Sequence, residues 1–287
     1  MIPLLRGSEV GGLRSYVENQ KTAKKFSYST KYNYLCTKFQ VQRYFFYMKY
    51  AIIAAGEGSR LAAEGVAEHK PLVRVHGECL VDRLLRIFAS NGADDIFVIC
   101  NEQYTDVASH LERLEREGLD GQRIPLRHIV KSTPSSMHSF FELSKLIGEG
   151  PVVLTTVDTI FRPDDFAKYI AALEKALAKG YDGMMGVTDY VDDEKPLYVS
   201  VDSGNSITGF HDLCVDGCRY VSGGIYGLNT DCLKTLADCM EKGVSRMRNF
   251  QRALIVDDRR LFAFPFTKVL DIDHASDIAK AEQFLAE

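Results

Sequence analysis

From residue 48 onward, the chain alternates short, strongly apolar segments with longer segments whose apolar residues recur at helical spacing. Residues 50–55, 95–100 and 151–157 are apolar runs of strand length, as expected for strands buried on both faces of a sheet. Between the first two, residues 78–90 place apolar side chains three or four positions apart, which is typical of an amphipathic helix. This alternation predicts a mostly parallel sheet with helices on both faces.

The second half of the chain departs from this alternation. Two short segments, residues 197–201 and 207–210, flank the sequence Asp202-Ser-Gly-Asn205. Asp, Gly and Asn tolerate the positive φ values of tight turns, so we expect a hairpin here. The predicted fold class is therefore α/β, a Rossmann-like three-layer α/β/α arrangement. Its mostly parallel mixed sheet carries a small antiparallel excursion in the second half.

The remaining elements follow from the same two patterns. Further strands are expected at residues 126–130, 183–188, 226–228 and 261–265. Further helices are expected at residues 103–117, 134–147, 164–179, 230–242, 245–256 and 275–286.

Residues 1–47 differ in composition from the rest of the chain. They carry eight Lys and Arg against two acidic residues, and ten Phe and Tyr, whereas the remainder holds 27 basic and 37 acidic residues. Basic residues interleaved with aromatic ones can bind single-stranded nucleic acid. However, Met48-Lys-Tyr50 directly precedes the first strand and resembles a natural start. We expect residues 1–47 to be an N-terminal extension without a role in the chemistry, residues 48–287 to form a single domain, and nucleic acid not to be a partner.

Composition argues against several classes of protein. The chain has 287 residues and 46% hydrophobic content, which suffices for a packed core. It has no run of about 18 apolar residues to cross a bilayer and no apolar secretory signal, so we expect a cytoplasmic protein without a membrane partner. The seven Cys are an odd number, and the close pair Cys214 and Cys218 has no second pair or His cluster at zinc spacing. Reduced, structural thiols are therefore favoured over a metal site.

Candidate site residues follow from where ligands bind in open α/β sheets. Because ligands lie at the carboxyl ends of the strands, the residues directly after each strand are the first to consider. Gly56-Glu-Gly-Ser-Arg60 follows the first strand, and Asp158 follows the strand at 151–157. Asp271 and Asp273 follow the last strand. The fold is expected to bring these distant segments together.

The segment Gly56–Arg60 suits a polyphosphate. Glycine has no Cβ, so backbone N–H groups can approach an anion closely, and Arg60 adds a planar donor for phosphate oxygens. The residues after Gly58 fit neither a dinucleotide fingerprint nor a Walker loop. Lys70 adds a second cation, and Pro71 is expected to hold it in an extended conformation. The alternatives are a plain tight turn and a surface lysine.

Two motifs resemble those of a known family. Ala54-Ala-Gly-Glu-Gly-Ser-Arg-Leu61, followed by Lys70-Pro-Leu72, resembles the signature of the nucleoside-triphosphate transferase superfamily. This superfamily includes the sugar-1-phosphate nucleotidyltransferases, which make sugar nucleotides, and the resemblance covers residues 48–287. It implies that Lys70 neutralises charge on the reacting phosphates. The residues that it implies for triphosphate binding are Ala54, Ala55, Gly56, Gly58, Ser59 and Arg60.

The same resemblance implies a metal site. Asp158 matches the family's metal-binding aspartate, and Asp271-Ile-Asp-His-Ala-Ser-Asp277 resembles a late acidic motif whose first acid completes the site. Magnesium is the implied cofactor, since it takes one or two carboxylates together with phosphates and water. The expected ligands are Asp158 and either Asp271 or Asp273, with Asp271 favoured by the motif. Without the resemblance, Asp158 could be a turn or capping residue. The expected catalytic residues are Arg60, Lys70 and Asp158.

The segments for the base and the acceptor phosphate are less specific. Where the family has a Gly-Thr-Ala segment that touches the base, this chain has Ser132-Thr-Pro-Ser-Ser-Met-His138. Ser135 and His138 are therefore candidates, and the identity of the base stays open. Lys195 and Lys268 are candidates for the acceptor phosphate, and solvated lysines are the alternative for each.

Two further segments bear on the acceptor. Val221-Ser-Gly-Gly-Ile-Tyr226 resembles the family's segment lining the acceptor pocket, which makes Gly224 a candidate. The alternative is that Gly223 and Gly224 permit close backbone packing. One predicted helix also carries a basic cluster, for which a solvated face is the alternative to a role in binding: Arg246, Arg248 and Arg252.

The resulting hypothesis is a magnesium-dependent nucleotidyltransferase. It would transfer a nucleoside monophosphate from a nucleoside triphosphate to a small phosphorylated acceptor, chiefly a sugar 1-phosphate, and release pyrophosphate. A phosphocholine-type acceptor is one alternative. A nucleotide-sugar-dependent glycosyltransferase is another, although Thr156-Val-Asp158 lacks the usual Asp-x-Asp motif. A catalytically inactive nucleotide-binding module is the third, and the oligomeric state is not predicted.

Overall fold

The central strand β1 (Lys49–Ala54) shows why this chain folds in layers. Its side chains alternate between two separate hydrophobic cores, with Tyr50 and Ile52 in one and Ala51 and Ile53 in the other. A strand buried on both faces needs a layer of helices on each side of its sheet.

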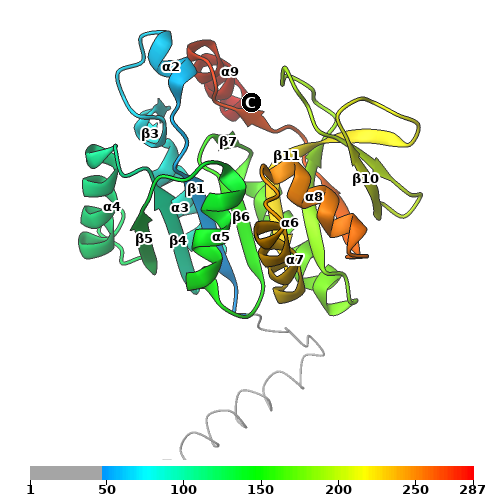
Figure 1. Ribbon diagram of the computed structural model, residues 1–287. Coiled ribbons are helices and arrows are strands. Elements are labelled where there is room, and N and C mark those ends of the chain that lie inside the picture. The colour runs from blue at the N-terminus through cyan, green and yellow to red at the C-terminus, as the bar shows by residue number, and fades with distance from the viewer. Residues whose placement is uncertain (1–46) are drawn as a thin grey trace, which may run out of the picture. The chain divides into compact units, whose positions relative to one another are not determined.

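The computed structural model describes residues 47–287 and confirms the predicted three-layer α/β/α fold (Figure 1). The main sheet has nine strands. Besides β1 they are β4 (Asp95–Cys100), β5 (Leu126–Val130), β6 (Val152–Thr156), β8 (Gly183–Thr188), β9 (Tyr198–Val201), β10 (Ile207–His211), β11 (Cys218–Leu228) and β12 (Leu261–Pro265). Their order is β10-β9-β11-β6-β1-β4-β5, and β8 pairs with both β11 and β12. The pairs among β6, β1, β4 and β5 are parallel, as is the pair β8 and β12. Among the strand pairs of this sheet, those made by β11 and the β9–β10 pair are antiparallel.

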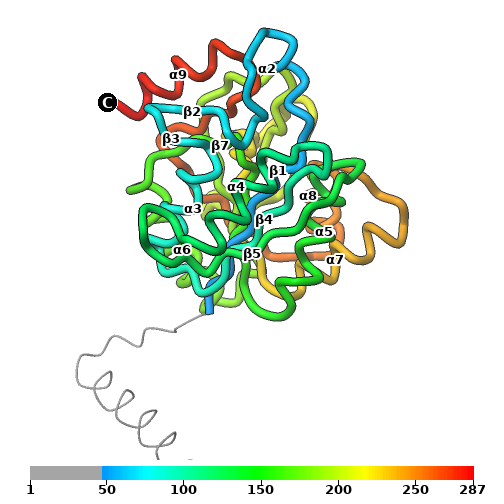
Figure 2. The backbone as a smooth tube through the Cα atoms, turned by 90° about the vertical axis from the view of Figure 1, so that its left-hand side faces the viewer, coloured from blue at the N-terminus to red at the C-terminus, as the bar shows by residue number. Residues whose placement is uncertain are grey.

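Helices cover both faces of this sheet. One core lies under α3 (Leu80–Ser90), α4 (Thr105–Glu117), α6 (Pro163–Ala178) and α9 (Ala275–Ala286). The other lies under α5 (Ser136–Ile147), α7 (Thr230–Glu241) and α8 (Met247–Val256). Figure 2 shows α3 and α6 to the left of the central strands and α5 and α7 to the right.

Most predicted elements are present with bounds shifted by at most two residues, and the predicted hairpin is formed by β9 and β10. The prediction for β11 was too short, because this strand begins at Cys218 rather than at 226. Its register against β8 shifts between Ser222 and Ile225, where Gly223 and Gly224 lie. Glycines within a bulge interrupt the apolar pattern that marks a strand, so the first half of β11 has no clear signal.

Several short elements were not predicted. They are α2 (Ser59–Ala63), β2 (Arg74–Val75), β3 (Glu78–Cys79), β7 (Thr159–Ile160), β13 (Leu270–Asp271) and a 3₁₀ turn at Lys70–Leu72. The 3₁₀ turn corrects the expectation that Lys70 is extended. The extended residue is His69, with φ −63° and ψ 142°, and Pro71 lies in the first turn, where its missing N–H costs nothing.

Residues 1–46 lie outside the described residues. The predicted N-terminal extension and its boundary near Met48 therefore stay predictions. Within the part of the chain that is described, no helix combines the length and the apolar character needed to cross a membrane.

Candidate active site

A cleft of about 750 Å³ opens at the carboxyl ends of β1 and β6. These strand ends point toward the upper part of Figure 1. The volume of the cleft is within the range of small-molecule sites. Twelve of the candidate residues line it: Ala55, Gly56, Gly58, Ser59, Arg60, Lys70, Ser135, Asp158, Lys195, Gly224, Asp271 and Asp273. The structure therefore brings together segments that sequence reasoning could only place at strand ends.

Three other candidates lie elsewhere. Ala54 is 1% exposed and belongs to a hydrophobic core. His138 is not a lining residue of the cleft, and its Nδ1 atom lies 2.8 Å from the hydroxyl of Ser135, which does line it. The ammonium of Lys268 lies 4.2 Å from the ring centre of Tyr190, outside the cleft.

The glycine loop, Gly56–Arg60, turns from β1 into α2. Gly58 has φ +61°, a left-handed conformation that disfavours side chains. A Cβ atom at this position would lie 3.1 Å from the Cβ atom of Lys70. Glycine at position 58 therefore allows the loop to lie directly against the Lys70 segment.

Lys70 connects two of the predicted carboxylates. Its Nζ atom lies 2.5 Å from Oδ2 of Asp158 and 2.7 Å from Oδ1 of Asp273, and its side chain is only 10% exposed. Arg60 reaches the other oxygen of Asp273 at 2.9 Å. Burial works against the charge of Lys70, but Asp158 and Asp273 outweigh this effect and raise the pKa of Lys70. Burial likewise disfavours the charge of Asp158, yet Lys70 holds the pKa of Asp158 below its usual value.

Two short strands place Asp158 beside the late acidic segment. β7 and β13 pair antiparallel, with Thr159 opposite Asp271. The N–H of Ile272 also donates to the carbonyl of Asp158 at 3.1 Å. This pairing fixes the late acids against the end of β6, although more than a hundred residues separate them in the chain. Strands of two residues have no periodic signal, so sequence reasoning missed the contact.

The carboxylates fit a hard cation such as Mg²⁺. Oδ1 of Asp158 is buried and has no hydrogen-bond partner among the described residues. The side chain of Asp271 is exposed in the cleft, but incomplete solvation there and the charges of Asp158 and Asp273 raise its pKa. A cation between Asp158 and Asp271 would relieve this repulsion and satisfy the free oxygen. Asp273 is instead occupied by Lys70 and Arg60.

These acids do not form a closed cage. In residues 47–287, Asp158, Asp271 and Asp273 do not constitute a group of three ligand atoms within 4.8 Å of one another. Lys70 Nζ contacts both Asp158 and Asp273. The arrangement suits an ion held by two carboxylates and completed by phosphate and water, which is the usual coordination of Mg²⁺ in phosphoryl-transfer sites.

The segment before β9 and the start of α8 bring further basic side chains to the cleft. Lys195 lines it, and its ammonium has no hydrogen bond or ion pair within the described part of the chain. Arg248 donates to the carbonyl of Lys195 at 2.9 Å and lies 2.7 Å from Asp212, which also binds Arg252 at 2.8 Å. Arg248 and Arg252 therefore fasten α8 to the segment after β10 rather than forming a freely solvated face. Arg246 and Arg248 also line the cleft, whereas Arg252 does not.

Gly224 lies where the cleft meets β7. It has φ +69°, and a Cβ atom there would lie 3.1 Å from the hydroxyl of Thr159. At Gly223, a Cβ atom would lie 3.2 Å from the carbonyl of Gly186. The close packing considered as an alternative for these glycines is therefore present, and Gly224 also borders the cleft.

Sequence reasoning missed Asn101, which directly follows β4. Its side chain is buried, its amide donates to the carbonyl of Ala55 at 3.2 Å, and its oxygen accepts from the hydroxyl of Ser132 at 2.7 Å. Asn101 thus ties the glycine loop to the segment expected near the base. The strand-end rule, applied to residues 95–100, would have indicated this residue.

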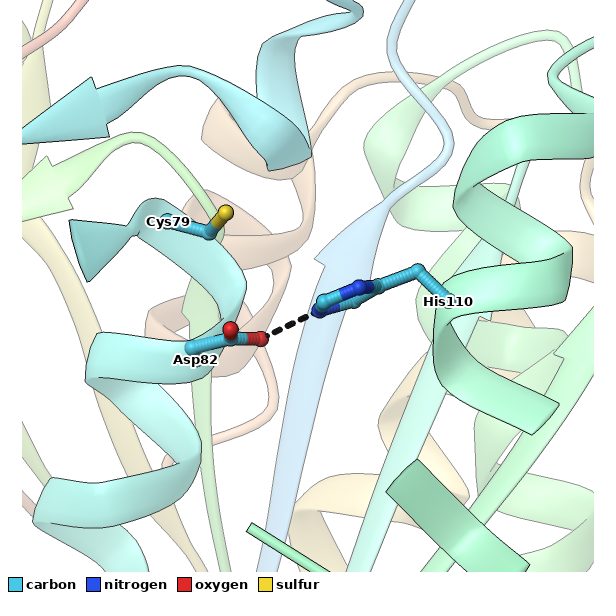
Figure 3. Close-up of side chains that lie close together, drawn as sticks. All are labelled: Cys79, Asp82 and His110. Carbon is cyan, nitrogen blue, oxygen red and sulfur yellow. Dashed lines mark hydrogen bonds and ion pairs between the residues drawn. The ribbon is translucent and has the colours of Figure 1, made fainter. Parts of the chain in front are cut away.

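A second group of polar side chains lies outside the cleft, where α3 meets α4 (Figure 3). Cys79, Asp82 and His110 each place a potential ligand atom within 4.8 Å of the other two. Both ring nitrogens of His110 are already engaged, Nε2 by Asp82 at 2.6 Å and Nδ1 by Arg113 at 3.2 Å. A metal ion would have to displace at least one of these bonds. We therefore assign this group a structural role in joining the two helices.

Known proteins share this fold. A family model described as MobA-like NTP transferase domain matches residues 50–254. The structure of the inositol-1-phosphate CTP transferase from T. maritima aligns with a TM-score of 0.65 and 20% identity, over 83% of this chain and 94% of that chain. A Bacillus anthracis protein assigned as a glucose-1-phosphate thymidylyltransferase, solved with sucrose, aligns with a TM-score of 0.70 and 15% identity, over 84% and 96%. At these identities the two structures establish the fold alone. Because the family match extends from β1 into α8 and covers most of the chain, this protein belongs to the family of MobA-like NTP transferase domains.

Proposed function

We propose that this chain is a magnesium-dependent nucleotidyltransferase. It transfers a nucleoside monophosphate from a nucleoside triphosphate to a small phosphorylated acceptor and releases pyrophosphate. The observation that carries the proposal is the meeting of Lys70, Asp158 and Asp273 beside the glycine loop, from segments up to 203 residues apart. An ammonium group and carboxylates that converge in a cleft beside backbone N–H groups fit the transfer of an anionic group.

The reaction joins two anions. A phosphate oxygen of the acceptor attacks the α-phosphorus, the bond from that phosphorus to the bridging oxygen of the β-phosphate breaks, and pyrophosphate leaves with the electron pair. The acceptor phosphate is already ionised, so the protein needs neither a side-chain nucleophile nor a general base. Its contribution is positioning and charge neutralisation.

The residues divide these tasks. The N–H groups of the glycine loop and the guanidinium of Arg60 bind the triphosphate, and Lys70 exchanges part of its contact with Asp158 and Asp273 for phosphate oxygens. Asp158 and Asp271 hold the magnesium ion, which supplies positive charge to the reacting phosphates. Ser135 and Gly224 both line the cleft, which supports our assignment of Ser135 to the nucleoside and of Gly224 to the acceptor.

A sugar 1-phosphate is the acceptor that we propose. The two similar structures are named for inositol 1-phosphate and glucose 1-phosphate as substrates, and these are polyol or sugar phosphates. Lys195 provides a cation without an ion-pair partner in residues 47–287, and so can bind the acceptor phosphate. Lys268 is a weaker candidate, because its ammonium lies against Tyr190 outside the cleft.

The test is a matrix of the four nucleoside triphosphates against sugar 1-phosphates, inositol 1-phosphate and phosphocholine, with pyrophosphate as the readout and magnesium omitted as the control. We expect magnesium-dependent release of pyrophosphate with at least one pair. If phosphocholine is the only acceptor that supports turnover, it replaces sugar 1-phosphate as the proposed acceptor. Nucleotide binding without turnover would indicate an inactive module. In a separate assay with a nucleotide sugar as the substrate, release of a nucleoside diphosphate would indicate a glycosyltransferase.

A further inference from the structure

The turn between β4 and α4 holds the glycine loop by its carbonyl groups. The side-chain amide of Asn101 donates to the carbonyl of Ala55 at 3.2 Å, and the hydroxyl of Tyr104 donates to the carbonyl of Glu57 at 2.7 Å. The two carbonyls are two residues apart. One anchor therefore lies at the start of the loop and the other at its middle.

These anchors determine where two loop N–H groups point. In a planar trans peptide, the carbonyl of one residue and the N–H of the next point in opposite directions. Fixing the carbonyl of Ala55 therefore directs the N–H of Gly56 away from the β4–α4 turn, and fixing Glu57 does the same for Gly58. Both glycines line the cleft, and their N–H groups have no acceptor within the described residues.

The same turn also fixes the residue that precedes Lys70. The ring of His69 stacks on the ring of Tyr104 with 3.8 Å between centroids and 20° between planes. Its Nδ1 atom lies 2.8 and 2.9 Å from the two oxygens of Asp106, in the first turn of α4. His69 is thereby held with φ −63°, the conformation from which Lys70 enters its 3₁₀ turn.

None of these four side chains lines the cleft, so within the described structure they act through other residues. Glycine is the residue with the most backbone freedom, and a loop containing two glycines would otherwise have to lose that freedom when it binds an anion. Contacts that order the loop beforehand lower this cost.

We propose that Asn101, Tyr104, His69 and Asp106 form a bracket of positioning residues that sets the glycine N–H groups and Lys70 in place before the triphosphate binds. This inference rests on the proposed function, because it names the triphosphate as the ligand of the loop. The ordering of the unliganded loop, however, can be measured without any substrate.

The first experiment measures binding of magnesium tripolyphosphate and of each magnesium nucleoside triphosphate by calorimetry. Tyr104→Phe retains the stacked ring but loses the hydrogen bond to Glu57. One hydrogen bond contributes about 0.5–1.5 kcal/mol, so we expect Kd to rise about 2- to 12-fold. His69→Ala should weaken binding similarly, with kcat changed less than KM once a substrate pair is known.

Two further variants, His69→Pro and His128→Ala, distinguish an effect of the bracket from a general loss of stability. His69→Pro should restore binding, because proline holds φ near −65° and the N–H of His69 has no acceptor in residues 47–287. His128→Ala is the matched control, since it removes a histidine–carboxylate contact of 2.8 Å to Glu115 on the same helix α4. It should bind like the wild type.

Hydrogen exchange of residues 56–60 in the unliganded protein provides the second readout. We expect faster exchange in Tyr104→Phe and His69→Ala, and wild-type exchange in His69→Pro and His128→Ala. Wild-type affinity and exchange in both Tyr104→Phe and His69→Ala would overturn the bracket, and a His69→Pro variant as impaired as His69→Ala would overturn the role of His69. A wild-type protein that binds no triphosphate would refute the proposed function instead.

Discussion

In the unliganded cleft, Lys70 provides the positive charge that neutralises two neighbouring carboxylates, those of Asp158 and Asp273. Exposed ion pairs contribute little to stability, but the Lys70 side chain is only 10% exposed and contacts two carboxylates. It therefore stabilises two acidic residues that would otherwise repel one another, and it fixes Asp158, which we propose as a metal ligand. Asp271 is the carboxylate left out of this pairing, which is why we favour it over Asp273 as the second metal ligand.

Asp158→Asn tests this arrangement. The substitution keeps the size of the side chain but removes the charge that we assign to metal binding, so we expect kcat to fall about 10²- to 10³-fold, the range typical for one electrostatic group. Asp273 still pairs with Lys70, and the midpoint of thermal unfolding should change little. Asp231→Asn, at an exposed ion pair on α7, is the control and should retain full activity. Wild-type turnover in Asp158→Asn would contradict the assignment.

Gly58→Ala tests the contact between the loop and Lys70. An alanine at φ +61° costs about 1–2 kcal/mol, and its Cβ would also press on the Lys70 side chain. Gly65→Ala is a matched control, because Gly65 has φ +88° and a Cβ there would meet nothing within 4 Å. Both variants should lower the midpoint of thermal unfolding, but only Gly58→Ala should raise the Kd for magnesium triphosphate. Equal affinities would show that the contact does not matter for binding.

At the scale of elements, the site depends on contacts between the ends of helices and the loops that follow the strands. Asp165 in the first turn of α6 accepts a hydrogen bond of 2.7 Å from Thr267, between β12 and β13, and pairs with Lys168 at 3.0 Å. This contact holds the segment that leads into the late acids. Burial disfavours the charge of Asp165, but Thr267 and Lys168 outweigh it and hold the pKa of Asp165 below its usual value.

The stability of this tie should depend on pH. A carboxylate whose pKa is lower in the folded state stabilises the fold above its unfolded pKa of about 4, and the contribution is lost as pH falls through the folded pKa. Asp165→Asn should therefore lower the free energy of unfolding at pH 7 by about 1–3 kcal/mol, and the difference from wild type should shrink below about pH 4. Urea titrations across this range measure it. Asp164→Asn, in the same helical turn, is the control. If the difference in unfolding free energy between Asp165→Asn and the wild type did not depend on pH, the proposed contribution of the Asp165 carboxylate would be refuted.

At the scale of the whole molecule, the periodicity of apolar residues predicted the three layers, but it did not predict the short strand pair that joins the late acidic segment to the end of β6. The runs at 95–100, 126–130, 183–188 and 261–265 have their predicted bounds. Two of them, 95–100 and 183–188, are buried along their whole length, as expected for strands covered on both faces, whereas 126–130 and 261–265 are only partly buried. The pairing of β7 with β13 could not be predicted, since two residues carry no period.

The same distinction explains why only part of the site was predicted. Residues at strand ends, such as Asp158, could be located because topology alone places strand ends at one edge of the sheet. Contacts that depend on side-chain geometry could not be located in this way. The bonds of Lys70 to two acids and of Tyr104 to Glu57 are of this kind, because they join distant segments through single atoms.

The whole-molecule organisation also gives a prediction for residues 1–47. The described cleft residues all lie between Ile53 and Asp273, so we expect a chain that starts at Met48 to retain both its turnover and its midpoint of thermal unfolding. Activity assays and calorimetry on the two chain lengths measure this. Loss of activity with an unchanged midpoint would assign a function to the N-terminal segment, and loss of both would make it part of the domain.

The pairing of β7 with β13 has a consequence for synthesis of the protein. A nascent chain that has emerged from the ribosome as far as β12 can already form the main sheet and the glycine loop, but it has no Asp271 or Asp273. Lys70 then has Asp158 but not Asp273 as a partner, and Asp271, the second carboxylate that we assign to magnesium, is translated only after β12 is complete. We therefore expect the metal site to be completed only after every strand of the main sheet has been translated.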